Sequence, residues 1–157
     1  VPEDYTREEL RQDLLCYTSP VLKENLVLTG DMTAELYISS DAPDTDFVVR
    51  VTDVDENGRS IKLADGLLSA RYRNGFARSE FLQEGEIVCL KIRTTKLSNC
   101  FRKGHRIRVT VTSSAKNFIF PNSNTRDGFN SQEIRLAHNC VHHGGRYRSA
   151  VTVMQEK

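Results

Sequence analysis

The stretch that decides the fold is LVLTGDMTAELYI, residues 26–38, in which apolar and polar residues alternate. Its even-numbered positions are apolar or glycine, and its odd-numbered positions are mostly polar. This period of two is typical of a half-buried β-strand, because successive side chains of a strand point to opposite faces of the sheet. Glycine inside a strand often marks a bulge, so we expect the strand to bend at Gly30. The sequence therefore predicts a long strand with one face in a hydrophobic core.

Alternation of apolar and polar residues recurs along the rest of the chain, in runs separated by turn signals. Asn57-Gly58 is a strong hairpin signal, and Asp65-Gly66 and Lys103-Gly104 mark further turns. A return strand is expected to begin at Ile61, after the first of these turns. The remaining strands are expected at residues 47–52, 67–72, 88–93, 106–112, 133–137 and 150–153.

Helical patterns are short and do not alternate with the strands. Helix is expected at residues 6–13, with Thr6 as the N-cap, and at residues 78–82, whereas residues 121–128 predict a loop. Many short strands without intervening helices predict an all-β fold with short helical turns. We expect residues 1–157 to form a single antiparallel β-sandwich domain of the jelly-roll, galactose-binding-like type.

The charge balance and the hydropathy exclude two classes of partner. Lys plus Arg number 22 and Asp plus Glu number 21, a net charge of +1, so neither nucleic acid nor an acidic membrane surface is expected as a partner. No apolar run approaches the ~18 residues of a membrane span. Val1 begins the chain without a signal peptide, so we expect a processed end or a fragment boundary. The compartment stays open, with the cytoplasm slightly favoured.

The four cysteines do not form a metal-binding or redox motif. Cys16, Cys89, Cys100 and Cys140 contain no C-x-x-C pair, and their spacing does not resemble a zinc site. We expect buried free thiols, because cysteine is often buried as a small hydrophobe, with a disulfide as the alternative.

An acidic stretch, residues 41–46, raises the question of a metal loop. Asp41, Asp44 and Asp46 loosely resemble a calcium loop but lack the pattern of alternating ligands that ends in glutamate. Aspartate is also frequent in turns, where its side chain bonds nearby backbone. We therefore expect no metal, and we expect these acids to cap loop amides or to pair with Arg71, Arg73 or Arg106.

Motifs that would make this chain an enzyme are missing from the sequence. It contains no G-x-S-x-G nucleophile elbow, no phosphate-binding loop and no dinucleotide fingerprint. His138 and His142 fall in a strand-like run, where positions four apart lie ~13 Å from each other, too far to share a metal ion. The chain has no Trp for stacking on sugars. Neither catalytic residues nor a cofactor are expected here.

The order of several motifs resembles a known family. SDAPDTDF (residues 40–47), DG leading to RYR (residues 65–73), and KGHRIR (residues 103–108) are similar to the C-terminal domain of the X-Pro dipeptidyl-peptidase and cocaine-esterase (CocE/NonD) serine hydrolases. The resemblance covers residues 11–154. It implies a jelly-roll domain that follows an α/β-hydrolase domain and its helical cap, with the Ser-Asp-His triad upstream, so that no catalytic residue is carried over to this chain.

The resemblance implies a supporting role for this domain. It would brace the upstream hydrolase domain, its partner in the same polypeptide, and help shape the active-site cleft, and a homo-oligomer is left open. Two other interpretations remain: a free-standing jelly-roll module that binds carbohydrate or another ligand, and a calcium-stabilised structural sandwich. The residues assigned to structural or inter-domain roles are Asp41, Asp44, Asp46, Arg71, Arg73, His105 and Arg106.

Overall fold

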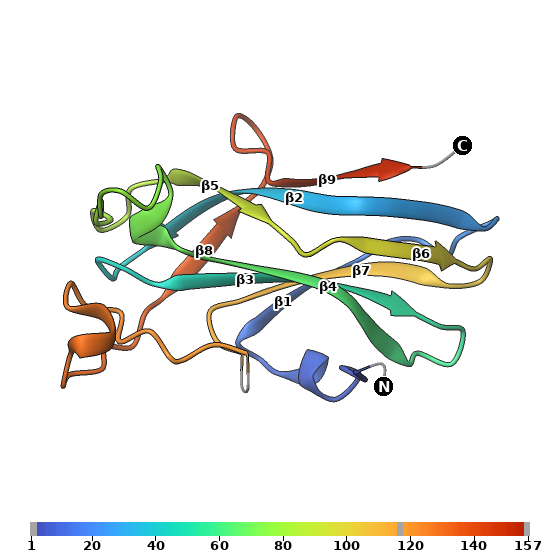
Figure 1. The fold of residues 1–157 in the computed structure, drawn as a ribbon, viewed down its shortest axis with the longest axis horizontal. Helices are drawn as coiled ribbons and strands as arrows, with labels where there is room; N and C mark the ends of the chain where they lie inside the picture. Colours follow the sequence, from blue (N-terminus) through green and yellow to red (C-terminus); the bar gives the residue numbers. More distant parts are fainter. Residues whose placement is uncertain (1–2, 116–117, 156–157) are drawn as a thin grey trace.

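The computed structural model describes residues 3–115 and 118–155, which form two antiparallel sheets packed on each other (Figure 1). The all-β antiparallel sandwich predicted from the sequence is confirmed. The strands of the described residues are β1 (Leu14–Thr18), β2 (Leu26–Ser40), β3 (Asp46–Val54), β4 (Ser60–Ser69), β5 (Val88–Arg93), β6 (Leu97–Phe101), β7 (Arg106–Thr112), β8 (Asn139–His142) and β9 (Ala150–Gln155). The short helices are η1 (Glu8–Leu10), η2 (Ala70–Tyr72) and η3 (Gly128–Asn130), and none of the described helices is long and apolar enough to cross a membrane.

The two sheets differ in how their strands are joined. One sheet has the order β1-β7-β3-β4. In the other, the 15-residue strand β2 lies in the centre, with β5 and β6 along one edge and β8 and β9 along the other. The pairing of β2 with β9 shifts in register between Thr29 and Thr33, and Gly30 there has a φ of 92°. The predicted bend at Gly30 is therefore confirmed.

The core lies between the sheets, where the predicted alternation of β2 is confirmed. Leu28, Met32, Ala34, Leu36 and Ile38 are all buried and contribute to two hydrophobic clusters. These clusters also take side chains from β3, β5, β6 and β7. Burial of apolar surface on this scale, at about 25 cal/mol per Å², is the main favourable term for the fold.

The outer face of the β3 sheet is also covered, which simple alternation does not predict. Glu9, in the N-terminal segment, is the anchor: its Oε1 accepts hydrogen bonds from the hydroxyls of Thr52 (3.0 Å) and Ser60 (2.8 Å). Its Oε2 lies 2.6 Å from a guanidinium nitrogen of Arg108, and the side chain is only 3% exposed. Sequence analysis passed over Glu9, because an acid in a polar run is usually solvated. Both faces of β3 are consequently buried.

Five local predictions were wrong, in whole or in part. Residues 133–137 form no strand: Ile134 and Leu136 are 83% and 77% exposed, and the Arg135 N–H donates to the Ser123 carbonyl in a loop. Residues 78–82 are not helical, and the helix expected at residues 6–13 is the single turn η1. The fourth wrong prediction is the Asp65-Gly66 turn, because β4 continues through both residues. The fifth is the strand expected at residues 67–72, because β4 ends at Ser69 and residues 70–72 form η2.

Gly66 permits a close approach between the sheets. It pairs with Val49 in the middle of β4, and a Cβ atom there would lie 2.5 Å from the carbonyl oxygen of Arg93 in the other sheet. Next to it, the Thr95 N–H donates to the Asp65 carbonyl at 2.9 Å. One edge of the sandwich is thus closed by backbone contact between β4 and the segment that joins β5 to β6.

The opposite edge, between β1 and β9, is open. Two adjoining apolar cavities of about 310 and 380 Å³ lie there and share Tyr17, Val109 and Val151 as lining residues. The Tyr17 ring packs edge-on against His143 with 5.6 Å between the ring centroids. This edge therefore holds a groove between the sheets in place of backbone contact.

The cysteines differ from the prediction in their burial. All four are free thiols, but Cys16, Cys100 and Cys140 are exposed and Cys89 is half-buried. Cys89, Cys100 and Cys140 pair with odd-numbered residues of β2, which point away from the core, so burial was the wrong expectation.

The close approach at Gly66 predicts a specific cost. Gly66→Ala should lower the free energy of unfolding by about 1–3 kcal/mol, because the added methyl group meets backbone of the other sheet that cannot move aside. The control is Leu67→Ala on the same strand, whose side chain is 40% exposed and which should cost less than about 1 kcal/mol. Urea denaturation of both variants measures the difference. Equal costs would show that the closed edge is not tightly packed.

Candidate functional site

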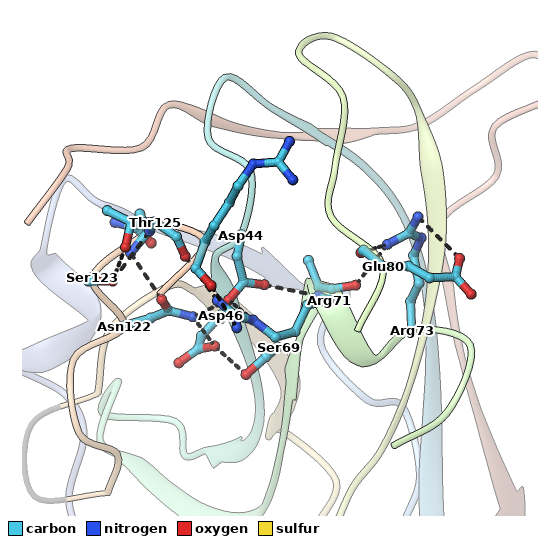
Figure 2. A network of polar contacts seen from close by, with 12 residues as sticks. Asp44, Asp46, Ser69, Arg71, Arg73, Glu80, Asn122, Ser123 and Thr125 are labelled. Carbon is cyan, nitrogen blue, oxygen red and sulfur yellow. Dashed lines mark hydrogen bonds and ion pairs between the residues drawn. The ribbon is translucent and has the colours of Figure 1, made fainter. Parts of the chain in front are cut away.

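The seven residues assigned to structural or inter-domain roles fall into two groups at opposite ends of the sandwich. Asp46 begins β3 and pairs with Ser69 at the end of β4, whereas Arg106 begins β7 beside Val54, the last residue of β3. The first group is Asp41, Asp44, Asp46, Arg71 and Arg73, and the second is His105 and Arg106. Asp44, Asp46, Arg71 and Arg73 of the first group belong to one polar network, which Figure 2 shows from close by.

Asp44 and Arg71 form the centre of this network. The Asp44 side chain is 1% exposed, and its Oδ2 lies 2.7 Å from Nε of Arg71. Its Oδ1 accepts a hydrogen bond from the backbone N–H of Arg71 at 2.9 Å, and Nδ2 of Asn122 donates to Oδ2 at 2.8 Å. One carboxylate thus fixes a helical turn, an arginine side chain and a distant loop, with charge-assisted hydrogen bonds that are stronger than neutral ones.

Asp46 is buried without an arginine in contact. Its Oδ1 accepts hydrogen bonds from the Ser69 hydroxyl (2.6 Å) and from the same Asn122 amide (2.9 Å). Burial raises the pKa of the Asp46 carboxyl, and the nearby charge of Asp44 raises it further. Asn122 therefore bridges two neighbouring carboxylates with its two amide hydrogens.

Arg71 and Arg73 connect the remaining loops to this centre. The guanidinium group of Arg71 donates to the carbonyl oxygens of Thr125 (2.9 Å) and Arg126 (3.2 Å). Arg73 donates to the carbonyls of Ala70 and Glu80. The two arginines face opposite sides of η2 and tie it to residues 121–128 and to the loop that follows η2 (Figure 2).

Asp41 holds the segment that precedes β8. Its carboxylate accepts hydrogen bonds from the backbone N–H of His138 (2.8 Å) and lies 2.8 Å from Nδ1 of the same residue. The backbone hydrogen bond lowers the pKa of Asp41, and the His138 side chain lowers it further. The Arg135 side chain donates to the Asp41 carbonyl. Asp41 consequently has partners of its own, whereas Asp44 and Asp46 share Asn122.

The second group performs a local task at the far end. Nδ1 of His105 lies 2.8 Å from Oδ1 of Asp53, and the Asn99 amide donates to the other oxygen of that carboxylate at 3.3 Å. Arg106 donates to the Ser19 carbonyl at 3.2 Å and does not reach the acidic stretch. The His105 contact joins the β6–β7 turn to β3, and the Arg106 contact joins β7 to the segment after β1.

The arrangement of side chains at the first end suits a rigid scaffold. Within residues 3–115 and 118–155, no group of three or more His, Cys, Asp and Glu side chains is placed to hold a metal ion. The carboxylates are taken up by backbone, arginine, serine and asparagine donors, and Asp44 and Asp46 share the amide of Asn122. Sequence analysis missed Asn122, because an asparagine in the loop PNSNT is indistinguishable from a turn residue until its partners are known.

The same end carries apolar side chains that are exposed. They belong to the loop after η2 and to residues 120–136, the two segments that the polar network fixes. Sequence analysis placed two of them in a strand. The exposed residues are Phe76, Phe120, Phe129, Ile134 and Leu136.

Comparison with known proteins finds the same domain in longer chains. The family model described as the X-Pro dipeptidyl-peptidase C-terminal non-catalytic domain matches residues 3–152. Cocaine esterase from Rhodococcus sp. is 36% identical over 155 residues, which are 97% of this chain and 27% of the esterase. The chain thus spans about a quarter of the length of this relative.

Solved structures agree in fold. The crystal structure of an aminopeptidase from a marine sediment Thaumarchaeota archaeon superposes with a TM-score of 0.93 at 27% identity and covers 99% of this chain and 28% of that one. An α-amino acid ester hydrolase superposes with a TM-score of 0.89 at 22% identity, over 96% of this chain and 27% of that chain.

The two neighbouring aspartates should respond differently to loss of charge. Asp44→Asn should lower the free energy of unfolding by about 3 kcal/mol, because it leaves the nearly buried Arg71 without its counter-charge. Asp46→Asn should cost less than about 1 kcal/mol, because an amide oxygen still accepts both hydrogen bonds and no charge is buried. Chemical denaturation at pH 7 compares them, and equal losses would contradict the assignment of Arg71 to Asp44.

The raised pKa of Asp46 also predicts a pH dependence. A carboxyl whose pKa is higher in the folded state stabilises the fold while protonated, and this contribution is lost as the pH rises through the folded pKa. The stability of Asp46→Asn relative to the wild type should therefore increase from about pH 4 to pH 7. Thermal unfolding of both proteins across this range measures it. A relative stability that falls with pH would mean that Asp46 is stabilised as an anion.

Proposed function

Because the chain belongs to the family of X-Pro dipeptidyl-peptidase C-terminal non-catalytic domains, we propose that residues 1–157 are the β-sandwich domain of a larger serine hydrolase. In this proposal the domain braces an α/β-hydrolase domain in the same polypeptide and helps shape the active-site cleft. The whole protein would be an X-Pro dipeptidyl-peptidase or an acyl-ester hydrolase.

The observation that carries the proposal is the family match over nearly the whole chain, residues 3–152. The cocaine esterase relative is named for ester hydrolysis, and 27% of its length corresponds to this chain. Most of the length of this relative lies outside the part that corresponds to this chain. The sequence of this chain has no G-x-S-x-G, which agrees with a nucleophile located elsewhere in the polypeptide.

The reaction of the whole protein would be acyl transfer. A serine activated by a histidine attacks an ester or amide carbonyl, the histidine passes the proton to the leaving group, and water then releases the acid. None of these steps needs a residue of the β-sandwich. The sandwich would instead help to hold the hydrolase domain and its active-site groups in position. A displacement of about 1 Å in an active site can lower the rate about 100-fold.

The polar network supports a bracing role. Loops that line a cleft are usually mobile, and mobile loops would not give an active-site cleft one defined shape. Here the loops at one end are tied to the strands by Asp44, Arg71 and Asn122, all of them nearly buried. A wall built in this way keeps its shape, which is the property that a supporting domain must have.

Labelling with a fluorophosphonate probe tests whether the catalytic serine lies outside this chain. The isolated 157-residue chain should take up no label and should not hydrolyse p-nitrophenyl acetate, because it lacks a nucleophile elbow. The full polypeptide should label on one serine outside this chain and should hydrolyse the ester. Stoichiometric labelling of a serine within the 157 residues would overturn the proposal.

A deletion tests the bracing role separately. Removal of the 157 residues from the full polypeptide should lower kcat/KM and melting temperature together, because the hydrolase domain loses its support. The Asp44→Asn variant of the full polypeptide should lower both in the same direction by a smaller amount. Unchanged kinetics after deletion would leave a serine hydrolase with an appended domain that does not brace it.

A further inference from the structure

We propose that the end of the sandwich that carries the polar network is the face that docks on the hydrolase domain, a step that rests on the proposed function. We call it the loop-end face and define it by five side chains on two loops. These are Phe76, Phe120, Phe129, Ile134 and Leu136. In Figure 1 the two loops lie at the left, in green and in orange.

The exposure of these side chains is the first observation. They are between 70% (Phe129) and 84% (Phe120) exposed, whereas the core phenylalanines Phe47 and Phe101 are at most 1% exposed. A single exposed apolar residue is ordinary, whereas several at one end of a domain mark a contact surface. Aromatic residues are also enriched in the buried centres of protein interfaces.

The rigidity of the loops is the second observation. The loop after η2 is fixed by backbone hydrogen bonds from Glu80 to Arg71 and from Leu82 to Pro43. The other loop is fixed by Asn122 and by the bond between Arg135 and Ser123. Rigid loops that present apolar side chains lose little conformational entropy on binding, so the surface is prepared for a partner.

A cavity that Leu136 of the loop-end face lines is the third observation. It has a volume of about 470 Å³ and is lined by Leu136, Asn122 and Asn139 among others. Nδ2 of Asn139 donates to the hydroxyls of Thr45 (3.0 Å) and Ser113 (2.7 Å), but its buried Oδ1 has no hydrogen-bond partner in the described protein. A buried acceptor of this kind is normally satisfied. The cavity has both apolar and polar side chains in its lining, so a docked segment that carries apolar groups beside hydrogen-bonding groups would fit it.

The occupant that fits these features is the hydrolase part of the same polypeptide. In the cocaine esterase relative, 27% of the length corresponds to this chain, so most of the polypeptide lies outside it and is available to cover the face. A partner that is covalently attached also acts at high effective concentration, so an interface of modest area is enough.

The groove at the open edge is a weaker candidate for the same contact. Its lining residues Val109 and Val151 already pack against the hydrophobic clusters and are half-buried. Tyr17 lies over it, against His143. The groove is part of the core of this sandwich, and no unpartnered polar atom among the described residues points to an occupant.

Charge substitutions in the full polypeptide test the proposal. Phe76→Asp and Ile134→Asp place one carboxylate on each loop of the loop-end face. Both side chains are well exposed, so the sandwich itself should still fold. Met154→Asp on β9 is the matched control, since Met154 is 70% exposed on another surface. We expect the first two variants to lower the melting temperature of the full polypeptide by about 4 °C or more and to reduce esterase activity, and the control to change neither.

Hydrogen exchange of the wild-type full polypeptide gives a second readout. Amides of residues 118–138 should exchange more slowly than those of the turn at residues 143–148, although both are surface loops of the sandwich. The docking proposal is overturned if Phe76→Asp and Ile134→Asp behave like Met154→Asp and the two loops exchange alike. It is also overturned if the variants convert a dimer into an active monomer, because the face is then a contact between two copies. The proposed function fails separately, if the full polypeptide has no serine that reacts with a fluorophosphonate.

Discussion

The structure at the candidate site depends on one interaction, the ion pair between Asp44 and Arg71. Asp44 is almost fully buried, and a buried charge is tolerated only when partners replace the lost water. Arg71 supplies both its backbone N–H and its side chain, and Asn122 supplies an amide. Because these partners come from η2 and from a loop 78 residues away in sequence, a single carboxylate determines how three segments meet.

Much of the fold could be predicted from the sequence, because its decisive signal is local. The alternation in β2 is set by which side chains face the core, and it is visible without any partner strand. Gly66 shows the limit: a glycine in a strand and a glycine in a turn look the same until the backbone of Arg93 is found 2.5 Å from its missing methyl group. The strand prediction around Ile134 was wrong for a related reason. Alternation predicts a strand, but it does not show whether a neighbouring strand is there to pair with it.

The candidate site was predictable in its composition and not in its pairing. Acids close in sequence must be compensated, and arginines are the natural donors, so the residue types at this end could be anticipated. The choice of partner depends on the three-dimensional path of the chain. Arg71 reaches Asp44, Arg73 turns to Glu80, and Arg106 lies at the other end of β3. Asp46 received a serine and an asparagine in place of an arginine, which leaves its carboxyl with a raised pKa.

The difference between the two edges of the sandwich has a mechanical consequence. Along one edge, β4 and the segment after β5 are in backbone contact at Gly66 and Thr95, and this contact fixes the distance between the two sheets there. Along the other edge, β1 and β9 are separated by an apolar groove. Thermal breathing of the sheets would therefore be a rotation about the Gly66 edge, with its amplitude greatest at β1 and β9. Forces applied to this domain by a neighbour would be absorbed at the open side and transmitted stiffly at the closed one.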